Sequence, residues 1–336
     1  MSGGITQLVA VGAQDAFIVG NPEVSFFQST YKRHTNFSQT VERQLMQGNP
    51  VANAMTTVRF DRKGDLLGYV YIAATDGSFV NWEQTIDSIE LYIGGQLIDT
   101  QYYEFSNLTT DILATSDSKS SLSVLTNFGN LNGTNFFPIR FFFSESWQSC
   151  LPLVALQYQD IEIRLYWGKD LQGKVYDVFA NYIYLDSSER DLMTKNRLDM
   201  LVTQVQRTTP SMNKNQQLTL NHPVKFLVSP LSDWNSNTSL VNLQINGTDV
   251  TEPKPGSPHF TWVTQYYHSP YVGTKRAFLY PFCLDTSKLQ PTGTLNFSRL
   301  DSARVISTKV IDTNIYAVNY NILRIEKGQA GIMYSN

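Results

Sequence analysis

Few side chains in this sequence are of the types that carry catalysis or bind metals, and their spacing matches no catalytic or metal-binding motif. The closest pair among the four histidines, His259 and His268, is nine residues apart, which is no metal-ligand spacing. The two cysteines form no CxxC pattern, which excludes the usual structural zinc site. Neither GxxxxGKS/T nor GxSxG occurs, so neither the usual phosphate-binding loop nor the usual nucleophile elbow is present. We therefore expect no catalytic residue, no metal site and no cofactor.

Three carboxylates, Glu145, Asp160 and Glu162, are the remaining candidates, because two neighbouring carboxylates can act as acid and base in hydrolysis. Asp160 and Glu162 alternate with the apolar residues Ile161 and Ile163. Such alternation is typical of a strand with one buried and one solvated face. We therefore interpret these carboxylates as the solvated side of a strand.

Aromatic residues in loop-like stretches leave open an alternative from another functional class, a carbohydrate-binding or hydrolytic β-sandwich. Aromatic platforms bind sugars, but Tyr and Trp are also enriched at protein–protein interfaces. A glycan array and a measurement of oligomeric state would separate these two interpretations. The residues concerned are Trp234, Trp262, Tyr266 and Tyr267.

The composition indicates a globular chain without a strongly charged partner. Its 336 residues suit two domains of about 150 residues each. A net charge of −3, with 16% charged residues, argues against a nucleic-acid-binding surface. No apolar run of about 20 residues occurs and the N-terminus lacks the order of a signal peptide, so we expect no membrane span. Cys150 and Cys283 are expected to be free thiols, although a disulfide between them stays open.

Alternating apolar residues predict short antiparallel strands in both halves of the chain. The clearest alternation runs through residues 161–165, where the isoleucines and the leucine are expected to be buried and Glu162 and Arg164 more exposed. Two glycines at 94–95 and an Asn-Gly pair at 246–247 each separate apolar runs, as tight hairpin turns do. Turn signals about every 8–12 residues, in two successive halves, predict two all-β domains, each a sandwich or a barrel.

One helix is predicted where the two halves meet. In the stretch 187–204 and just beyond it, Leu192, Leu198, Leu201 and Val205 recur at roughly helical spacing. A helix at this position would link two β-domains.

The N-terminal stretch divides at Gly20-Asn21-Pro22, a sequence that breaks regular structure. Before this point, residues 3–19 mix apolar and small side chains without the period of a strand or a helix. After it, residues 23–27 alternate as a strand does. Because ordering a residue costs about 1–2 kcal/mol of backbone entropy, we expect residues 3–19 to be an arm that becomes ordered only against a neighbour.

The N-terminal stretch and five later segments resemble a known family. The stretch reads QLVAVGAQDAFIVGNPEVSFFQSTYKRHTNFS, and the later segments read LPLVALQYQDIEIRLYW, YIYLDSSERDLM, LNHPVKFLV, PTGTLNFSRLDSARV and NIYAVNYNILRIEKGQAGIMYSN. Together they resemble the double jelly-roll major capsid proteins of large nucleocytoplasmic DNA viruses, the phycodnavirus and iridovirus-like group. The resemblance covers the chain end to end, while the insertions between strands are short for the family, especially in the second half.

The resemblance implies an all-β fold of two tandem eight-stranded antiparallel jelly rolls joined by a short linker helix. The expected divisions are an N-terminal arm at 1–22, a first jelly roll at 23–186, a linker with its helix at 187–210 and a second jelly roll at 211–336.

The resemblance also implies a structural function and not an enzymatic one. Three copies are expected to form a pseudo-hexagonal capsomer, and capsomers to build the icosahedral shell of a large DNA virus. The expected partners are the chain itself as a homotrimer, neighbouring capsomers and minor capsid proteins beneath the shell, close to an internal viral membrane and without direct nucleic-acid contact. Its expected location is the virion, assembled in the cytoplasm of the infected host cell. The short insertions leave a minor capsid paralogue of the same fold open.

Two groups of residues near the N-terminus are expected to contact neighbours in such an assembly. The apolar group is Leu8, Val9, Phe17 and Ile18, and the basic group is Lys32, Arg33 and His34. Among the six Asn-X-Ser/Thr sequences, Asn36 and Asn296 fall in family-like strands and are interpreted as structural. The other four lie in loop-like stretches and are candidate N-glycosylation sites: Asn107, Asn132, Asn237 and Asn246.

Overall fold

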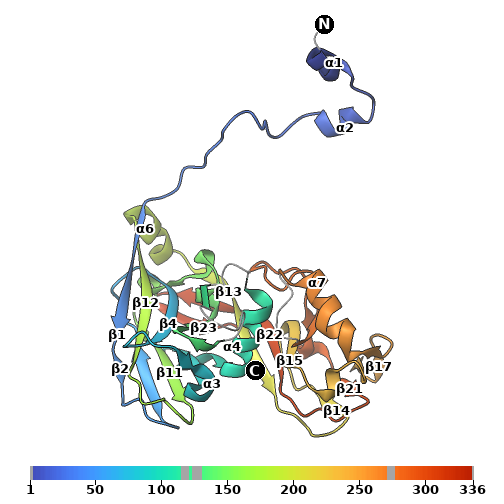
Figure 1. The fold of residues 1–336 in the computed structure, drawn as a ribbon. Coiled ribbons are helices and arrows are strands. Elements are labelled where there is room, and N and C mark those ends of the chain that lie inside the picture. Colours follow the sequence, from blue (N-terminus) through green and yellow to red (C-terminus); the bar gives the residue numbers. More distant parts are fainter. Residues whose placement is uncertain (1–2, 115–120, 123–130, 271–276, 335–336) are drawn as a thin grey trace. The chain divides into compact units, whose positions relative to one another are not determined.

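The computed structural model of the chain separates into two units, Met1–Asn36 and Phe37–Asn336 (Figure 1). Every buried residue that the structure describes lies in the second unit, which is built mainly from antiparallel strands. The described residues are 3–114, 121–122, 131–270 and 277–334.

The first unit contains two short helices, α1 (Gly3–Val9) and α2 (Asp15–Val19), and its described side chains are all exposed. The strand predicted for residues 23–27 is wrong, because this segment has no regular secondary structure. An extended segment becomes a strand only when a neighbour pairs with its backbone N–H and C=O groups, and alternation of side chains does not supply that neighbour.

Two antiparallel sheets form what we call the first sandwich. The strands of one sheet lie in the order β1 (Phe37–Gln44), β12 (Tyr176–Leu185), β4 (Leu66–Ala74) and β10 (Leu151–Pro152), and β9 (Phe136–Ile139) also pairs with β4. The strands of the other lie in the order β2 (Met46–Gln47), β3 (Met55–Arg59), β11 (Ile161–Trp167), β6 (Ile86–Ile93) and β7 (Gln96–Tyr102). The pair β5 (Val80–Asn81) and β8 (Asn132–Thr134) and the helix α3 (Trp82–Thr85) complete this part of the chain.

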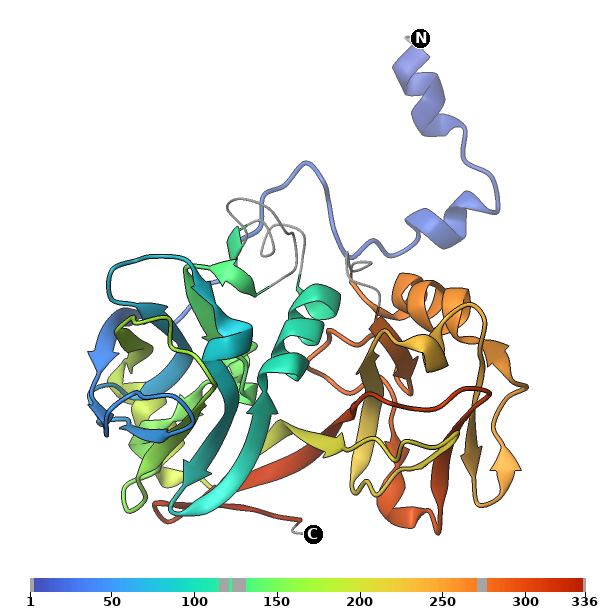
Figure 2. The same cartoon turned by 60° about the horizontal axis from the view of Figure 1, so that its bottom comes forward.

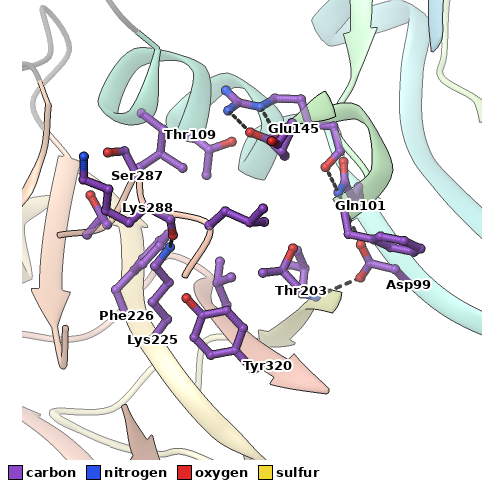
Figure 3. A pocket seen from close by; sticks show the side chains of 18 of the residues that line it. Asp99, Gln101, Thr109, Glu145, Thr203, Lys225, Phe226, Ser287, Lys288 and Tyr320 are labelled. Atoms are coloured by element: carbon purple, nitrogen blue, oxygen red, sulfur yellow. Dashed lines mark hydrogen bonds and ion pairs between the residues drawn. The ribbon is translucent and has the colours of Figure 1, made fainter. Parts of the chain in front are cut away.

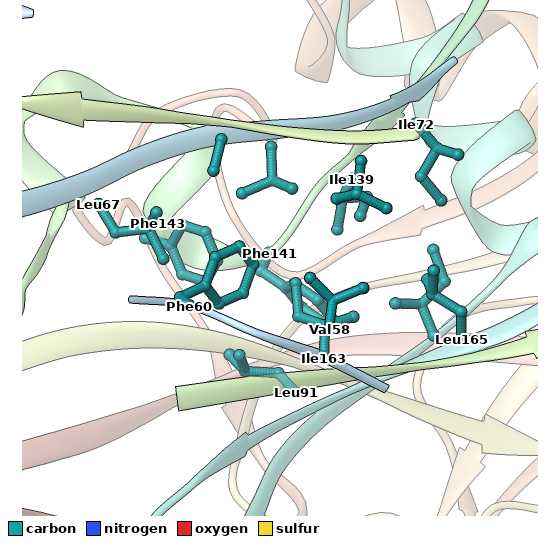
Figure 4. Close-up of a cluster of buried hydrophobic side chains, with 14 of the residues drawn as sticks. Val58, Phe60, Leu67, Ile72, Leu91, Ile139, Phe141, Phe143, Ile163 and Leu165 are labelled. Atoms are coloured by element: carbon teal, nitrogen blue, oxygen red, sulfur yellow. The ribbon is translucent and has the colours of Figure 1, made fainter. Parts of the chain in front are cut away.

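Apolar side chains from both sheets fill the first sandwich. In β11 the two isoleucines and the leucine of the predicted alternation are buried, whereas Glu162 and Arg164 are half-buried, which confirms the prediction. The predicted hairpin between β6 and β7 is also confirmed, and both of its glycines, Gly94 and Gly95, have the positive φ that such a turn requires. Figure 4 shows the centre of this core, with Val58, Phe60, Leu67, Ile72, Leu91, Ile139, Phe141, Phe143, Ile163 and Leu165 labelled.

The second sandwich repeats this arrangement with its own pair of antiparallel sheets. One sheet has the order β13 (Leu198–Thr208), β22 (Ile315–Glu326), β15 (Pro223–Pro230) and β19 (Ala277–Pro281), extended by β20 (Leu295–Asn296) and β23 (Gln329–Ile332). The other has the order β14 (Asn215–Gln217), β21 (Ala303–Ser307), β16 (Leu240–Ile245) and β17 (Thr248–Asp249), with β18 (Lys254–Pro255) paired to β16. The predicted turn at Asn246-Gly247 joins β16 to β17. The helix α7 (Thr264–His268) follows a helical segment at Gly256–Val263.

The helix predicted for residues 187–204 is confirmed only in its first half. The helix α6 (Ser187–Lys195) begins at Asp186, whose side chain accepts a hydrogen bond from the backbone N–H of Ser187, and ends before Asn196, which is extended. The residues after it form β13, which pairs along its whole length with β22. The helical spacing of Leu198, Leu201 and Val205 was therefore misleading, because the backbone pairing of β13 with β22 outweighs the local periodicity of the side chains.

A helix that directly follows β7 is largely buried. The helix α4 (Tyr103–Leu113) packs Phe105, Leu108 and Ile112 against apolar residues of the second sandwich. Figure 2 shows α4 between the two sandwiches and the red strand β22 running from one to the other. The second unit is therefore one body whose two sandwiches share an apolar junction.

Candidate functional site

The three carboxylates that could have acted in hydrolysis are each held by an arginine. The shortest contacts are 2.6 Å from Arg59 to Asp160, 2.7 Å from Arg164 to Glu162 and 2.8 Å from Arg140 to Glu145. Within the described residues each of the three is therefore paired with a guanidinium and not with another of the three, so these carboxylates form no acid–base pair. The interpretation of Asp160 and Glu162 as surface groups agrees with this geometry.

The histidines and cysteines serve structural contacts. The Nδ1 atom of His268 lies 2.9 Å from the backbone oxygen of Cys283, and the ring of His259 packs edge-on against Phe260. Within the described ranges no three His, Cys, Asp or Glu side chains gather where a metal could bind. Both cysteines are buried and free, and burial raises the pKa of the Cys150 thiol to about 11, so that it stays protonated. Among the described helices, none is long and apolar enough to cross a membrane.

Of the four aromatic residues proposed as a sugar platform, Trp234 does not lie on the surface, whereas Trp262, Tyr266 and Tyr267 are exposed. Trp234 is fully buried in the second sandwich, where its Nε1 donates to Thr313 over 2.8 Å. Tyr266 and Tyr267 are exposed on α7, packed edge to face with ring centroids 5.0 Å apart. Because Trp234 is buried, it cannot contribute to a sugar-binding surface, which weakens the carbohydrate-binding interpretation.

The apolar residues of the N-terminal unit are exposed to an unusual degree. Phe17 is 93% exposed and Ile18 84%, and Leu8 and Val9 are exposed on α1. These exposed apolar side chains are not buried in a hydrophobic core within this unit. Such exposure is expected of an arm that becomes ordered against a neighbouring molecule. The basic group Lys32, Arg33 and His34 is exposed in the same unit.

The candidate glycosylation sites differ in how free their side chains are. Asn107 lies within α4, and its Oδ1 accepts a hydrogen bond from the backbone of Leu131 over 3.1 Å. The Oδ1 of Asn246 accepts from two backbone N–H groups, at residues 301 and 302, over 3.0 Å each. Asn237 is exposed in a loop, and Asn132 lies in β8. Asn237 and Asn246 are both exposed, and Asn246 is the one whose side chain is held by these backbone hydrogen bonds.

Polar contacts tie the two sandwiches together around the apolar junction. The Oδ1 of Asp99 in β7 accepts from the backbone N–H of Val205 in β13 over 2.8 Å. The Oε2 of Glu104 accepts from the hydroxyl of Tyr316 over 2.6 Å and from the amide of Asn314 over 2.9 Å. Because these bonds join residues far apart in the sequence, sequence reasoning did not find them.

A group of aromatic side chains, which we call the aromatic ladder, covers the outer face of the β4 sheet. Ring centroids lie 5.1 Å apart for Tyr71 and Phe179, 5.9 Å for Tyr71 and Phe136, and 6.4 Å for Tyr69 and Trp147. Trp147 is 66% exposed and Tyr69 is 37% exposed. The alternation of Tyr69 and Tyr71 with buried residues of β4 was the sequence signal for this surface.

Comparison with known proteins identifies both halves of the second unit. The family described as "Major capsid protein N-terminus" matches residues 25–194, and that described as "Large eukaryotic DNA virus major capsid protein" matches residues 235–331. The major capsid protein of Pyramimonas orientalis virus is 31% identical, and that of Paramecium bursaria Chlorella virus 1 is 28% identical, each over the full length of both chains. These matches agree with the resemblance found in the sequence.

Solved structures show the same fold. The crystal structure of VP54 from PBCV-1 gives a TM-score of 0.79 at 24% identity and covers 93% of this chain and 100% of VP54. The Faustovirus major capsid protein gives a TM-score of 0.62 at 11% identity, with 94% of each chain covered. With the family matches, these similarities establish that the chain belongs to the major capsid protein family of large eukaryotic DNA viruses.

Proposed function

We propose that this chain is the repeating unit of an icosahedral virion shell and that it acts as a homotrimer. The observation that carries the proposal is its 31% identity to a major capsid protein along the whole of both chains. With two sandwiches in each chain, three chains supply six similar β-domains, which suits a pseudo-hexagonal capsomer. A closed trimer also uses up its complementary patches and so does not polymerise without limit.

The junction between the sandwiches supports this function because a shell tile must be rigid. The apolar contacts of α4 and the bonds of Asp99 and Glu104 oppose rotation of one sandwich against the other. Neighbouring tiles can therefore meet with a constant geometry.

The aromatic ladder is our candidate for a contact between subunits. Exposed Tyr and Trp side chains are enriched where proteins meet, and a stable trimer contact is expected to bury about 2,000 Å² or more. Trp147, at the exposed end of the ladder, would be buried by such a contact.

The N-terminal unit is our candidate for contacts with other capsid components. Leu8, Val9, Phe17 and Ile18 would pack against a neighbouring capsomer or a minor capsid protein beneath the shell, near an internal membrane. The group at 32–34 would face an acidic neighbour.

The proposal keeps the two eight-stranded jelly rolls that the resemblance implies, with two adjusted boundaries. The arm then reaches Asn36, where the first structural unit ends. The linker is shortened to α6, because β13 (Leu198–Thr208) pairs within the second sandwich. The first jelly roll would then span 37–186 and the second 198–336.

A minor capsid paralogue of the same fold remains a second candidate, favoured by the length of the chain. The alignment with the Pyramimonas orientalis virus protein spans 399 positions, more than the 336 residues of this chain, so the relative carries additional residues. A major capsid protein would be the most abundant protein of purified virions, and a paralogue would not.

We propose Asn237 as the first candidate for N-glycosylation, because its side chain is exposed in a loop. Peptide mapping of virion protein by mass spectrometry tests this. Asn107 is the site expected to stay unmodified, because it lies in α4 and its Oδ1 accepts a hydrogen bond from the backbone N–H of Leu131.

Light scattering coupled to size-exclusion chromatography tests the trimer. We expect one species of three times the 38.1 kDa chain mass, and negative-stain images of pseudo-hexagonal plates. A monodisperse monomer across the accessible concentration range would contradict the proposal.

A further inference from the structure

A cavity of about 360 Å³ lies at the junction of the two sandwiches (Figure 3). Its walls come from α4, β7 and the segment around Arg140–Ser146 on one side, and from β13, β15, β22 and residues 286–289 on the other. This volume lies within the range of about 300–1,000 Å³ that is usual for small-molecule sites. Neither the proposed shell function nor the family membership assigns a role to it.

Lys225 of β15 brings a buried positive charge to this cavity. Its side chain is 5% exposed, and its Nζ donates one hydrogen bond, to the backbone oxygen of Lys288 over 2.8 Å. It makes no ion pair with any carboxylate of the described chain, and burial lowers the pKa of its ammonium group. A buried ammonium group with donors to spare is costly unless an acceptor satisfies it.

Tyr320 of β22 brings a buried hydroxyl without a partner to the same cavity. It is 5% exposed, and its hydroxyl makes no hydrogen bond to any residue that the structure describes. Lys225 Nζ lies 5.7 Å from the centroid of its ring. Other buried tyrosines do find acceptors: the hydroxyl of Tyr182 donates to Gln44 over 3.0 Å, and that of Tyr316 to Glu104 over 2.6 Å. A buried polar group left unsatisfied in this way is uncommon and points to a missing partner.

The other charged groups on the walls leave the cavity positive, and the nearby Asp285, which is not a wall residue, offsets part of the charge of Lys225. Arg140 and Glu145 neutralise one another through two hydrogen bonds of 2.8 and 2.9 Å. Lys288 adds a second ammonium group, which is exposed, and Asp99 is a wall carboxylate whose charged form is disfavoured by burial. The other walls are apolar, with Phe105, Phe142, Leu201, Phe226, Leu289 and Val318.

We propose that this cavity binds a small anion with an apolar body, whose carboxylate or phosphate oxygens meet Lys225 and Tyr320. The ammonium group and the phenolic hydroxyl then donate to the anion, and the apolar body packs against side chains such as Phe142 and Phe226. Because the two donors belong to the second sandwich and Phe142 to the first, the ligand stabilises the junction as well as filling it.

Isothermal titration calorimetry and thermal unfolding of the purified full chain test the proposal. The probes are octanoate, phenyl phosphate, neutral octanamide and inorganic phosphate, each at millimolar concentration. We expect octanoate or phenyl phosphate to bind once per chain and raise the melting temperature, with the stronger of the two identifying a carboxylate or a phosphate ligand. Octanamide should not bind, and inorganic phosphate should bind more weakly than phenyl phosphate.

Two variants and a matched control locate the binding site. Lys225→Met and Tyr320→Phe should each weaken probe binding at least tenfold, or about 1.4 kcal/mol. Tyr316→Phe, on the same strand but bonded to Glu104 outside the cavity, should bind the probe as the unmodified chain does. Tyr320→Phe removes a hydroxyl that has no partner among the described residues, so this variant should fold normally. It therefore tests the site even if Lys225→Met fails to fold. Absence of binding by both octanoate and phenyl phosphate, equal binding of inorganic phosphate, or binding that Tyr320→Phe leaves unchanged would each overturn the proposal.

Discussion

Replacing Asp99 by asparagine should remove the pH dependence that this residue, at the junction between the sandwiches, gives to the free energy of unfolding. Asp99 lies in β7, is fully buried, and accepts hydrogen bonds from the backbone of Val205 over 2.8 Å and from the side chain of Gln101 over 3.2 Å. Burial raises the pKa of its carboxyl group from 3.8 to about 7, although both hydrogen bonds act in the opposite direction. Asparagine keeps the shape and the acceptor for Val205 but cannot ionise.

The size of the effect follows from the pKa values of the folded and unfolded chains. Because the folded chain holds the Asp99 proton up to about pH 7 and the unfolded chain releases it near 3.8, the folded chain binds more protons between these values. The stabilisation is therefore complete below about pH 3.8 and is lost as pH rises through about 7. A pKa difference of about three units corresponds to about 4 kcal/mol of the free energy of unfolding. About 3 kcal/mol of this stabilisation is lost between pH 5 and pH 8. The other charged groups of the cavity are Lys225, Lys288 and the Arg140–Glu145 pair, none of which is removed by the substitution.

Urea unfolding at about pH 5 and about pH 8 measures this effect. The unmodified chain should lose about 3 kcal/mol more of its free energy of unfolding over this range than Asp99→Asn does. Asp199→Asn is the control: Asp199 is an exposed carboxylate whose pKa is lowered to about 2 by Arg197 and Arg324, so its titration lies below this pH range. Equal pH dependence of Asp99→Asn and the unmodified chain would refute the assignment of this effect to Asp99.

Three further changes test the core, the arm and the aromatic ladder. Ile163→Asp puts an unpaired charge into the first sandwich and should lower the free energy of unfolding by about 3 kcal/mol or more, whereas Glu162→Ala should change it by less than about 1 kcal/mol; equal urea midpoints would mean that the strand register is wrong. Deleting residues 1–36 should leave a folded trimer that melts within a few degrees of the full chain but no longer forms shells, as seen by electron microscopy; an insoluble product would place the segment in the core. Trp147→Ala should keep the melting temperature of the monomer and weaken the trimer by about 1–2 kcal/mol, measured by sedimentation equilibrium, and an unchanged trimer would exclude the ladder as a contact.

Features that depend on neighbouring residues in the sequence could be predicted. The alternation around Ile163 sets which side chains are buried, and the glycines at 94–95 set the hairpin, because strands have a period of two and tight turns need positive φ. The helix α6 was likewise predicted to begin at Ser187, where it does begin, and the structure shows Asp186 as its N-cap, a residue type that favours a helix start.

Features that depend on distant partners could not be predicted. The residues at 198–205 satisfied a helical pattern, yet their partner β22 lies more than a hundred residues away and determines that they are a strand. The helix α4 also depends on distant residues, because its buried face packs against the second sandwich.

The inter-sandwich cavity shows the same limit for a candidate site. Asp99, Lys225 and Tyr320 come together only in the folded chain. One local signal was available in the sequence. Lys225 lies inside the apolar run from Val224 to Val228, whereas a lysine that only solvates the end of a strand would lie outside such a run. A single polar residue inside an otherwise apolar strand is a reason to look for a buried site.

The strand β22 explains why the second unit behaves as one body. Its first residues, including Ile315 and Ala317, belong to the core of the second sandwich, whereas Leu323 and Ile325 belong to the core of the first. Between them, Tyr316 and Val318 pack against α4. Rotation of one sandwich relative to the other would therefore break the continuous ladder between β22 and β13 and expose apolar surface from three clusters at once. The junction therefore opposes rotation of the sandwiches. If the chain assembles as proposed, we expect adjustment between neighbouring copies to come from the N-terminal unit, whose described side chains are all exposed.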